Sequence, residues 1–257
     1  MKTKVIAEIG VNHNGNLNSA KSLIKVAKKS GADIAKFQFF SSEFLLIDST
    51  PLVEYQKINL KNKKNTSQFK MLKRLELDLQ DLIEIEKYCQ SINIDFMISV
   101  FDMLSLKRAL KHLKTAKLKL GSGEITNYPL LVAIGSSGKK IILSTGMSSI
   151  AEIYLALGGI AVGYFRLEGK VDIQKFIKTN KFKVWLKSKA KQKIELMHCI
   201  SQYPTPIEFL NLKSIELLKE EFGLPVGFSD HSLSLISPAI AVGLGISSVE
   251  KHLTLNQ

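Results

Sequence analysis

The chain alternates short apolar runs with segments of helical periodicity, and it does so eight times in 257 residues. The runs predicted as β-strands are residues 5–9, 34–39, 95–100, 118–120, 140–144, 194–199, 226–228 and 248–253. Segments between them place apolar residues at helical spacing, as in 18–29, 79–89, 104–112, 210–221 and 235–243. Eight parallel strands with intervening helices predict one closed (β/α)8 barrel, the TIM-barrel fold, over residues 1–257.

An open, doubly wound sheet is the competing architecture, and the first predicted turn argues against it. That fold normally carries G-x-G-x-x-G after its first strand, whereas residues 10–15 read GVNHNG. Two cysteines are too few for a disulfide framework. The N-terminal apolar run is interrupted by Glu8, and no later stretch offers about 20 consecutive apolar residues. We therefore expect a cytoplasmic protein with no membrane association.

The net charge of +13 is concentrated in two segments. Residues 57–74 carry six lysines and one arginine without an acid, and residues 158–193 carry nine lysines and one arginine against two acids. Base readout favours arginine, and the chain has only three, so nucleic acid is not an expected partner. A non-catalytic barrel that binds polyanions through these lysines remains the alternative to an enzyme.

Segment 158–193 is also too long for an ordinary loop between barrel units, so we expect an insertion there. Its aromatic residues predict a small satellite cluster that anchors it, made of Tyr164, Phe176, Phe182 and Trp185.

Polar side chains gather where the predicted strands end, which is the catalytic mouth of a barrel. Glu8 ends the first strand, and Lys36 and Gln38 share one face of the second. An inward lysine is costly without an anion, so Lys36 and Lys119 predict an anionic ligand. Hydroxyls that follow strands and precede helices favour phosphate, although each also fits a helix cap. These hydroxyls belong to Ser122, Ser144, Thr145 and Ser229.

Two histidines lie on neighbouring predicted strands. His231 follows the seventh strand and His252 lies in the eighth, so neutral imidazoles with a nearby carboxylate could hold a divalent metal ion. The alternative is that His231 bonds to Asp230 and His252 to a phosphate. Cys89 lies in a predicted helix and Cys199 beside apolar residues, so neither is expected to act as a nucleophile.

Seven ordered motifs resemble the sialic acid synthase family of nonulosonic acid synthases. They are IAEIGVNHNG at 6–15, AKFQ at 35–38, KLGSGE at 119–124, LSTGM at 143–147, YPTP at 203–206, GFSDH at 227–231 and EKH at 250–252. The resemblance implies condensation of phosphoenolpyruvate with an N-acylated hexosamine, with N-acetylmannosamine as the first expectation, to give a sialic-type acid and phosphate. Legionaminic and pseudaminic acid synthases of the same family remain alternatives.

The resemblance also implies a role for each mouth residue. Phosphoenolpyruvate would be held by Lys36, Lys119, Ser122, Ser144, Ser201 and Ser229, although some family members carry asparagine in place of Ser201. A divalent ion, Mn²⁺ or Mg²⁺, would be bound by His231 and His252. The amino sugar would contact Gln38, Glu124 and Tyr203. Glu8 would orient or deprotonate the water that adds to the intermediate, and no organic cofactor is implied.

Family members continue beyond the EKH motif with an acidic sugar-binding segment, a covering helix and a small antifreeze-like domain that reaches the partner's site in a homodimer. The printed sequence ends at Gln257. The resemblance therefore implies a barrel without those parts, and a homodimer when the chain is full length. We accordingly expect Val249 and Leu253 to expose apolar surface on the eighth strand, and the 257-residue chain to be poorly soluble or nearly inactive.

Overall fold

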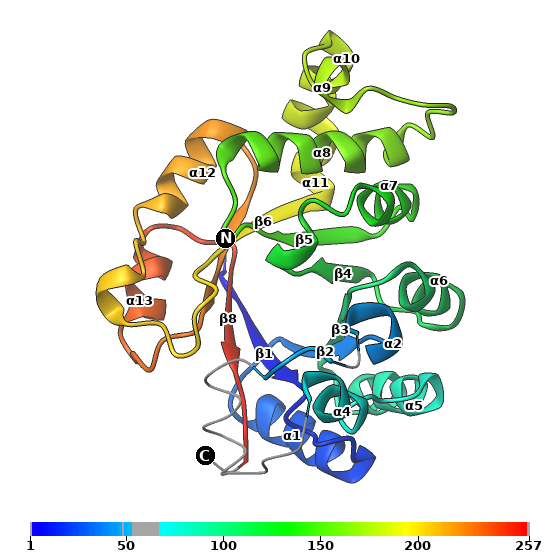
Figure 1. Cartoon of the computed structure of the whole chain (residues 1–257). Helices are drawn as coiled ribbons and strands as arrows, with labels where there is room; N and C mark the ends of the chain where they lie inside the picture. The colour runs from blue at the N-terminus through cyan, green and yellow to red at the C-terminus, as the bar shows by residue number, and fades with distance from the viewer. Residues whose placement is uncertain (1, 48, 53–66, 256–257) are drawn as a thin grey trace.

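Eight parallel strands close into a barrel in the computed structural model, which describes residues 2–47, 49–52 and 67–255 (Figure 1). Each strand pairs with the next along the chain, and β8 returns to pair with β1. The strands are β1 (Lys4–Gly10), β2 (Ile34–Phe39), β3 (Asp95–Val100), β4 (Lys117–Leu120), β5 (Lys140–Ser144), β6 (Ile194–Cys199), β7 (Val226–Asp230) and β8 (Ser248–His252). The predicted fold is confirmed, and all eight predicted strands are present.

The barrel interior is built in two layers. Side chains of a strand alternate with a period of two, so the residues that face the axis follow from the sequence. The lower layer is a separate apolar cluster of Ile6, Ile34, Met97, Ile142 and Met197. Two positions further along the same strands lie Glu8, Lys36, Ser99, Ser144 and Cys199, all of them buried. A mostly polar layer of side chains therefore lies next to an apolar layer, at the ends of the strands where a barrel binds its ligand.

Helices surround the barrel and pack their apolar faces on the outer faces of the strands (Figure 1). The longer ones are α1 (Leu17–Lys29), α5 (Leu79–Ser91), α6 (Met103–His112), α7 (Tyr128–Ser136), α8 (Ile150–Tyr164), α12 (Ser214–Phe222) and α13 (Ser237–Gly243). Short turns of helix are α2 (Ser42–Leu45), α4 (Gln68–Lys73), η1 (Ser122–Glu124) and η3 (Ile207–Phe209). The predicted helix at 210–221 begins later than expected, because the chain first makes the η3 turn.

Glycines let α7 and α8 approach each other unusually closely. A Cβ atom added to Gly163 would lie 1.9 Å from the Val132 carbonyl oxygen, and one added to Gly135 would lie 2.1 Å from that of Ile160. The two backbones are therefore in direct contact, and no larger residue fits at either glycine.

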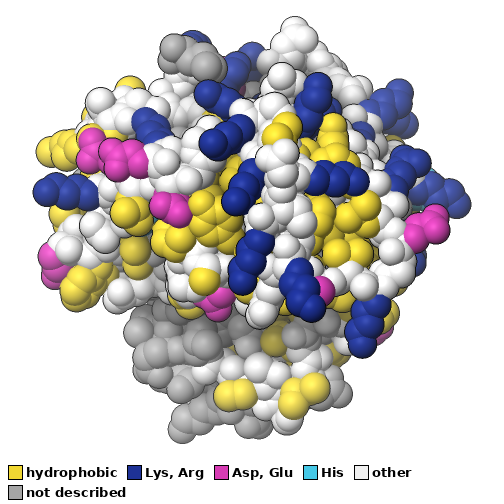
Figure 2. All heavy atoms as spheres, turned by 90° about the horizontal axis from the view of Figure 1, so that it is seen from above, with side chains coloured by type: hydrophobic (Ala, Val, Ile, Leu, Met, Phe, Trp, Pro, Cys, Tyr) yellow, Lys and Arg dark blue, Asp and Glu magenta, His cyan; other side chains and the backbone are white. Residues whose placement is uncertain are grey.

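The predicted insertion begins later than 158, because α8 continues to Tyr164 as a regular barrel helix. The remainder folds into α9 (Ile173–Phe176), α10 (Asn180–Trp185), the π-helical turn η2 (Leu186–Ala190) and α11 (Lys191–Lys193). The predicted aromatic anchors do pack together, with ring centroids 5.8 Å apart for Phe182 and Trp185 and 6.0 Å for Phe176 and Phe182. Phe176, Phe182 and Trp185 extend the main core, however, and do not form a satellite cluster. Tyr164 lies outside this core and is 38% exposed, with its ring 5.9 Å from that of Trp185. Lysines surround exposed apolar patches on this side of the molecule (Figure 2).

Strand β8 does not expose the apolar face that the sequence predicted. Val249 is buried in the main core beside Phe228 of β7, and Leu253 packs partly against the same core. The Lys251 ammonium folds back to Asp230, with Nζ 2.7 Å from Oδ2. Of the basic segment 57–74, only residues 67–74 are described. None of the helices in the described ranges is long and apolar enough to cross a membrane.

Candidate active site

Four charged side chains from four strands meet in the polar layer of the barrel. The Nζ atom of Lys36 on β2 lies 2.6 Å from a carboxylate oxygen of Glu8 on β1 and 3.5 Å from one of Glu250 on β8. Lys119 on β4 reaches across the barrel, and its Nζ lies 2.5 Å from Glu250 Oε1. Each of the four residues is at most 5% exposed. Two carboxylates and two ammonium groups thus form a buried cluster without net charge, which we call the four-charge cluster.

Glu250 is the centre of the four-charge cluster, because it contacts both lysines. It also accepts a hydrogen bond from Ser229 Oγ at 2.8 Å. Burial opposes the charged form of its carboxylate, but the lysines and Ser229 outweigh burial and hold the pKa of Glu250 well below its usual range. Glu250 is therefore an anion near pH 7.

The two lysines differ in their electrostatic surroundings. Burial disfavours the ammonium form of Lys36, but the carboxylates of Glu250 and Glu8 more than compensate and raise its pKa. Burial dominates at Lys119, and the nearby Lys36 adds repulsion, so the pKa of Lys119 is lowered despite its contact with Glu250. Lys119 is thus the weaker of the two cations and the easier one to deprotonate.

The premise that Lys36 and Lys119 lack an anion within the chain is wrong. Glu8 and Glu250 supply both counter-charges. The sequence argument overlooked this pairing because it weighed the strands one at a time, whereas barrel closure brings β8 beside β1 and opposite β4. An anionic ligand in this mouth would have to share the lysines with the two carboxylates.

A glycine at the end of β1 shapes the contact between Glu8 and Gln38. Gln38 Nε2 donates to Glu8 Oε1 at 3.0 Å. The β1–β2 register shifts between Glu8 and Gly10, and Gly10 has a positive φ of 55°. A Cβ atom there would lie 3.1 Å from Glu8 Oε1 and 3.3 Å from Gln38 Nε2. Gly10 therefore serves both the bulge and the close approach of these two side chains.

His231 is held in one orientation beside the four-charge cluster. Its Nδ1 lies 2.7 Å from the Ile200 carbonyl oxygen, which can only accept, so Nδ1 carries the proton and donates. Its Nε2 lies 3.1 Å from Ser229 Oγ. Burial is the main cause that lowers the pKa of His231 to about 4, so the ring is neutral near pH 7. The alternative bond from His231 to Asp230 is wrong, because Asp230 pairs with Lys251 and accepts from Ser237.

The structure brings His252 and Tyr203 to the same place as His231. The two histidine ring centroids lie 5.7 Å apart, and Tyr203 stacks on His231 at 4.1 Å and meets His252 edge-on at 5.9 Å. His231 is half-buried and His252 is exposed at the mouth. Within the described ranges, no group of three His, Cys, Asp or Glu side chains is arranged to hold a metal ion.

The remaining predicted residues lie around this centre in smaller groups. Ser122 and Ser201 form a pair, with their hydroxyl oxygens 3.2 Å apart. Ser144 is buried and contacts the Cys199 thiol, whose pKa is raised mainly by burial. Glu124 accepts from Asn127 Nδ2 at 2.7 Å near the start of α7.

Thr145 donates to the Met197 carbonyl oxygen at 3.2 Å, so its hydroxyl is occupied by the fold. Burial raises the pKa of the Cys89 thiol to about 12, and the raised pKa of Cys199 agrees with the prediction that neither cysteine is a nucleophile.

Sequence reasoning missed two residues of this site. Glu250 received no role, although it stands in the EKH motif two positions before His252. Ser99 accepts from Lys36 Nζ at 3.2 Å, and its signal was a lone polar residue on the inward face of an apolar strand, two positions after Met97. Both follow from extending the period-two pattern to every strand.

Comparison with known proteins decides the family. The profile of the NeuB family matches residues 23–257. The chain belongs to the NeuB family. Two NeuB-type relatives are N,N'-diacetyllegionaminic acid synthases: that of Campylobacter jejuni is 40% identical over 100% of this chain and 69% of its own length, and that of Legionella pneumophila is 37% identical over 98% and 64%.

A solved structure gives the same result for the barrel. The N-acetylneuraminic acid (sialic acid) synthetase of Leptospira borgpetersenii matches with a TM-score of 0.76 and 30% identity, over 100% of this chain and 74% of that one. The chain thus spans 64% of the length of the Legionella relative, 69% of the Campylobacter relative and 74% of the Leptospira structure.

Proposed function

We propose that this NeuB-family barrel condenses phosphoenolpyruvate with an N-acylated amino sugar to give a nonulosonic acid and inorganic phosphate. The observation that carries the proposal is the four-charge cluster of Glu8, Lys36, Lys119 and Glu250 at the mouth of the barrel. Two buried lysines that share two carboxylates can pass part of their charge to a substrate with two anionic groups, a carboxylate and a phosphate. We also propose that the protein is cytoplasmic and forms a homodimer.

The reaction needs charge stabilisation and one proton acceptor. Carbon 3 of phosphoenolpyruvate attacks the aldehyde carbon of the open-chain sugar, and positive charge develops at carbon 2. Water adds there and loses one proton, while the former aldehyde oxygen takes up a proton to become a hydroxyl. The second proton of that water leaves as the carbon–oxygen bond to phosphate breaks, which gives a ketone and inorganic phosphate. In the proposal, Lys36 and Lys119 bind the carboxylate and phosphate of phosphoenolpyruvate, with hydroxyls from Ser122, Ser144, Ser201 and Ser229. Glu8 orients the water and accepts its proton.

The two histidines fit a divalent metal ion. His231 is neutral, and its Nδ1 bond to a carbonyl fixes the ring, as outer contacts do for metal-bound histidines. His231 and His252 would hold Mn²⁺ or Mg²⁺, with solvent or substrate completing the coordination. Such an ion would supply Lewis-acid polarisation of the aldehyde oxygen. We expect His252→Ala to weaken Mn²⁺ binding at least tenfold by calorimetry, while His112→Ala, an exposed control, leaves it unchanged. Equal affinities would place the ion elsewhere.

The amino sugar is proposed to bind over Tyr203, Gln38 and Glu124. The first expectation from sequence was N-acetylmannosamine. The two legionaminic acid synthases share 37% and 40% identity with this chain, against 30% for the sialic acid synthetase. Identity therefore favours the diacetamido hexose of a legionaminic acid synthase as the first substrate to test, with N-acetylmannosamine second and the pseudaminic acid precursor third.

The test is release of inorganic phosphate from phosphoenolpyruvate, with Mn²⁺ and each of the three sugars in turn. We expect release with one of them, with product formation checked by mass spectrometry. Lys36→Met should lower the rate at least a hundredfold, whereas Lys21→Met, at a half-exposed surface pair with Glu84, should leave it unchanged. No release with any sugar, together with salt-sensitive retention on heparin, would favour the polyanion-binding alternative.

A further inference from the structure

The loop that joins β7 to α13, residues 231–236, begins with His231 and has little apolar anchoring. Its three large apolar side chains point to solvent, with Leu233 84%, Leu235 89% and Ile236 67% exposed. Burial of apolar surface therefore contributes little to the conformation of this loop. Hydrogen bonds and charge have to hold the loop in place.

A lysine on the neighbouring strand supplies several of these contacts. Lys251 on β8 is the register partner of Asp230 on β7, and its Nζ lies 2.7 Å from Asp230 Oδ2. The same Nζ donates to the carbonyl oxygens of Ser232 at 2.8 Å and Ser234 at 3.2 Å. An ammonium group has three N–H donors, so all three donors of Lys251 are used, two of them on the loop itself.

Asp230 holds the same loop from its buried side. Its side chain is fully buried, and Oδ1 accepts from the backbone nitrogen of Ser232 at 2.9 Å. Oδ2 also accepts from the hydroxyl of Ser237, the first residue of α13, at 2.8 Å. A buried carboxylate is stable when a cation and further donors surround it, as they do here. The Asp230–Lys251 pair therefore connects β8, the loop and the start of α13.

This ion pair stands one residue before each histidine of the mouth. His231 follows Asp230 in the chain, and His252 follows Lys251. Within the described ranges, the backbone pairing of β7 with β8 ends at Asp230 and Lys251. The Ile200 carbonyl orients the His231 ring from the end of β6. The ion pair in turn sets where the end of β8, and with it His252, lies relative to that ring.

We propose that Lys251, together with Asp230, is a positioning residue that holds His231 and His252 at the separation a single divalent ion requires. Two ligands from different strands bind one ion only when both nitrogens reach it at once, and the tolerated error in distance is a few tenths of an ångström. The two ring centroids lie 5.7 Å apart. This inference rests on the metal site proposed above, and it adds that a residue outside the mouth sets the affinity of that site.

Calorimetric titration with Mn²⁺ alone tests the inference. Lys251→Met removes the ammonium group and keeps an unbranched side chain, but it leaves Asp230 buried without a cation. The double variant Asp230→Asn/Lys251→Met removes both charges and so avoids that penalty. We expect both variants to weaken Mn²⁺ binding about tenfold, as loss of an outer partner does at other metal sites. Lys251→Arg keeps a cation beside Asp230 and should recover most of the lost affinity.

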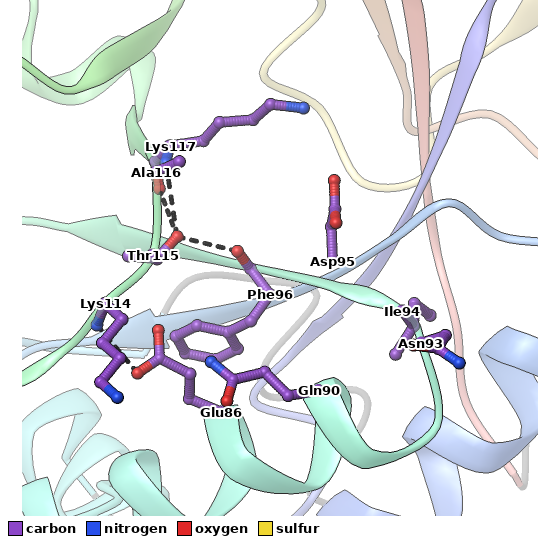
Figure 3. Close-up of a pocket in the computed structure, with 10 residues that line it drawn as sticks. All are labelled: Glu86, Gln90, Asn93, Ile94, Asp95, Phe96, Lys114, Thr115, Ala116 and Lys117. Atoms are coloured by element: carbon purple, nitrogen blue, oxygen red, sulfur yellow. Dashed lines mark hydrogen bonds between the residues drawn. The ribbon is translucent and has the colours of Figure 1, made fainter.

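Two controls separate positioning from general stability. Figure 3 shows Thr115 at the opposite end of the barrel, where its hydroxyl donates toward the Phe96 carbonyl oxygen at 2.8 Å and lies 3.0 Å from that of Lys117. Thr115→Val breaks this contact between β3 and β4, and should lower the urea midpoint without changing Mn²⁺ affinity. Lys219→Met removes a half-buried lysine that donates to the Leu244 carbonyl oxygen beyond α13, and should also leave the affinity unchanged.

Two results would overturn this inference and leave the proposed function standing. One is wild-type Mn²⁺ affinity in the double variant, with circular dichroism showing that it has folded. The other is an equal loss of affinity in Thr115→Val, which would make the effect one of general stability. A different result, equal Mn²⁺ affinity of wild type and His252→Ala, would overturn the proposed metal site and this inference with it.

Discussion

Replacing the Glu250 carboxylate with an amide of the same shape, Glu250→Gln, removes one charge from the four-charge cluster. Lys36 keeps Glu8 at 2.6 Å, but Lys119 loses its ion-pair partner, the only one it has among the described residues. Breaking a buried ion pair from one side typically costs about 3–5 kcal/mol, because the remaining charge is left uncompensated. The loss of stability has an upper limit here, because Lys119 can release a proton and become neutral.

This upper limit on the stability lost in Glu250→Gln depends on pH. Taking a lysine from its ordinary pKa of about 10.4 to the neutral form costs about 1.36 kcal/mol per pH unit, which is about 4.6 kcal/mol at pH 7 and about 1.9 kcal/mol at pH 9. The folded-state pKa of Lys119 is already lowered in the wild type, and loss of the Glu250 carboxylate, which raises it, lowers it further. The difference in bound protons between the unfolded and folded states is therefore larger in the variant than in the wild type. Stability of Glu250→Gln relative to wild type must therefore rise as the pH rises from 7 to 9.

Urea unfolding at pH 7, 8 and 9, followed by the fluorescence of Trp185, measures the free energy of unfolding of Glu250→Gln relative to wild type. The control is Glu84→Gln, which breaks the Lys21–Glu84 pair of the same 2.5 Å length, with side chains 29% and 47% exposed. We expect the control to cost less than about 1 kcal/mol at every pH. A cost for Glu250→Gln that is equally small and independent of pH would refute the reasoning, because Lys119 would then need no counter-charge.

Three further predictions concern the fold. Gly163→Ala should destabilise the chain by several kcal/mol in urea unfolding, because its Cβ would meet the Val132 carbonyl oxygen, whereas Gly243→Ala, with nothing within 4 Å, should be neutral or stabilise by up to about 1 kcal/mol. Phe182→Ala should lower the free energy of unfolding by about 3–5 kcal/mol, since the ring is 1% exposed. A loss under about 1 kcal/mol would show that segment 165–193 is not part of the core. Burial lowers the pKa of His13 to about 4, so about 3 kcal/mol of stability should be lost as pH falls from 6.5 to 4, and His13→Asn should flatten that acid dependence.

The barrel could be predicted from sequence because its signal is local and repeated. Each strand is a short apolar run, and on β1, β2, β3 and β5 an inward polar residue stands two positions beyond an inward apolar one, as Lys36 does beyond Ile34. Pairing across the barrel is not local. Lys119 and Glu250 are 131 positions apart, and nothing in either motif states that one neutralises the other. The start of the insertion was misplaced because residues 158–164 were assigned to it, whereas they complete α8, where the glycines at 158, 159 and 163 allow close packing.

The contact between Lys119 and Glu250 also bears on the order of events in folding. It joins β4 to β8, so it forms only after the last strand has entered the barrel. Until then both side chains remain hydrated, and their desolvation falls at the step that closes the ring. A contact that forms after the rate-limiting barrier slows unfolding but does not speed folding. If the ring closes after that barrier, changes at Glu250 should shorten the lifetime of the closed barrel and leave the rate of refolding almost unchanged; slower refolding of Glu250→Gln would place closure at or before the barrier.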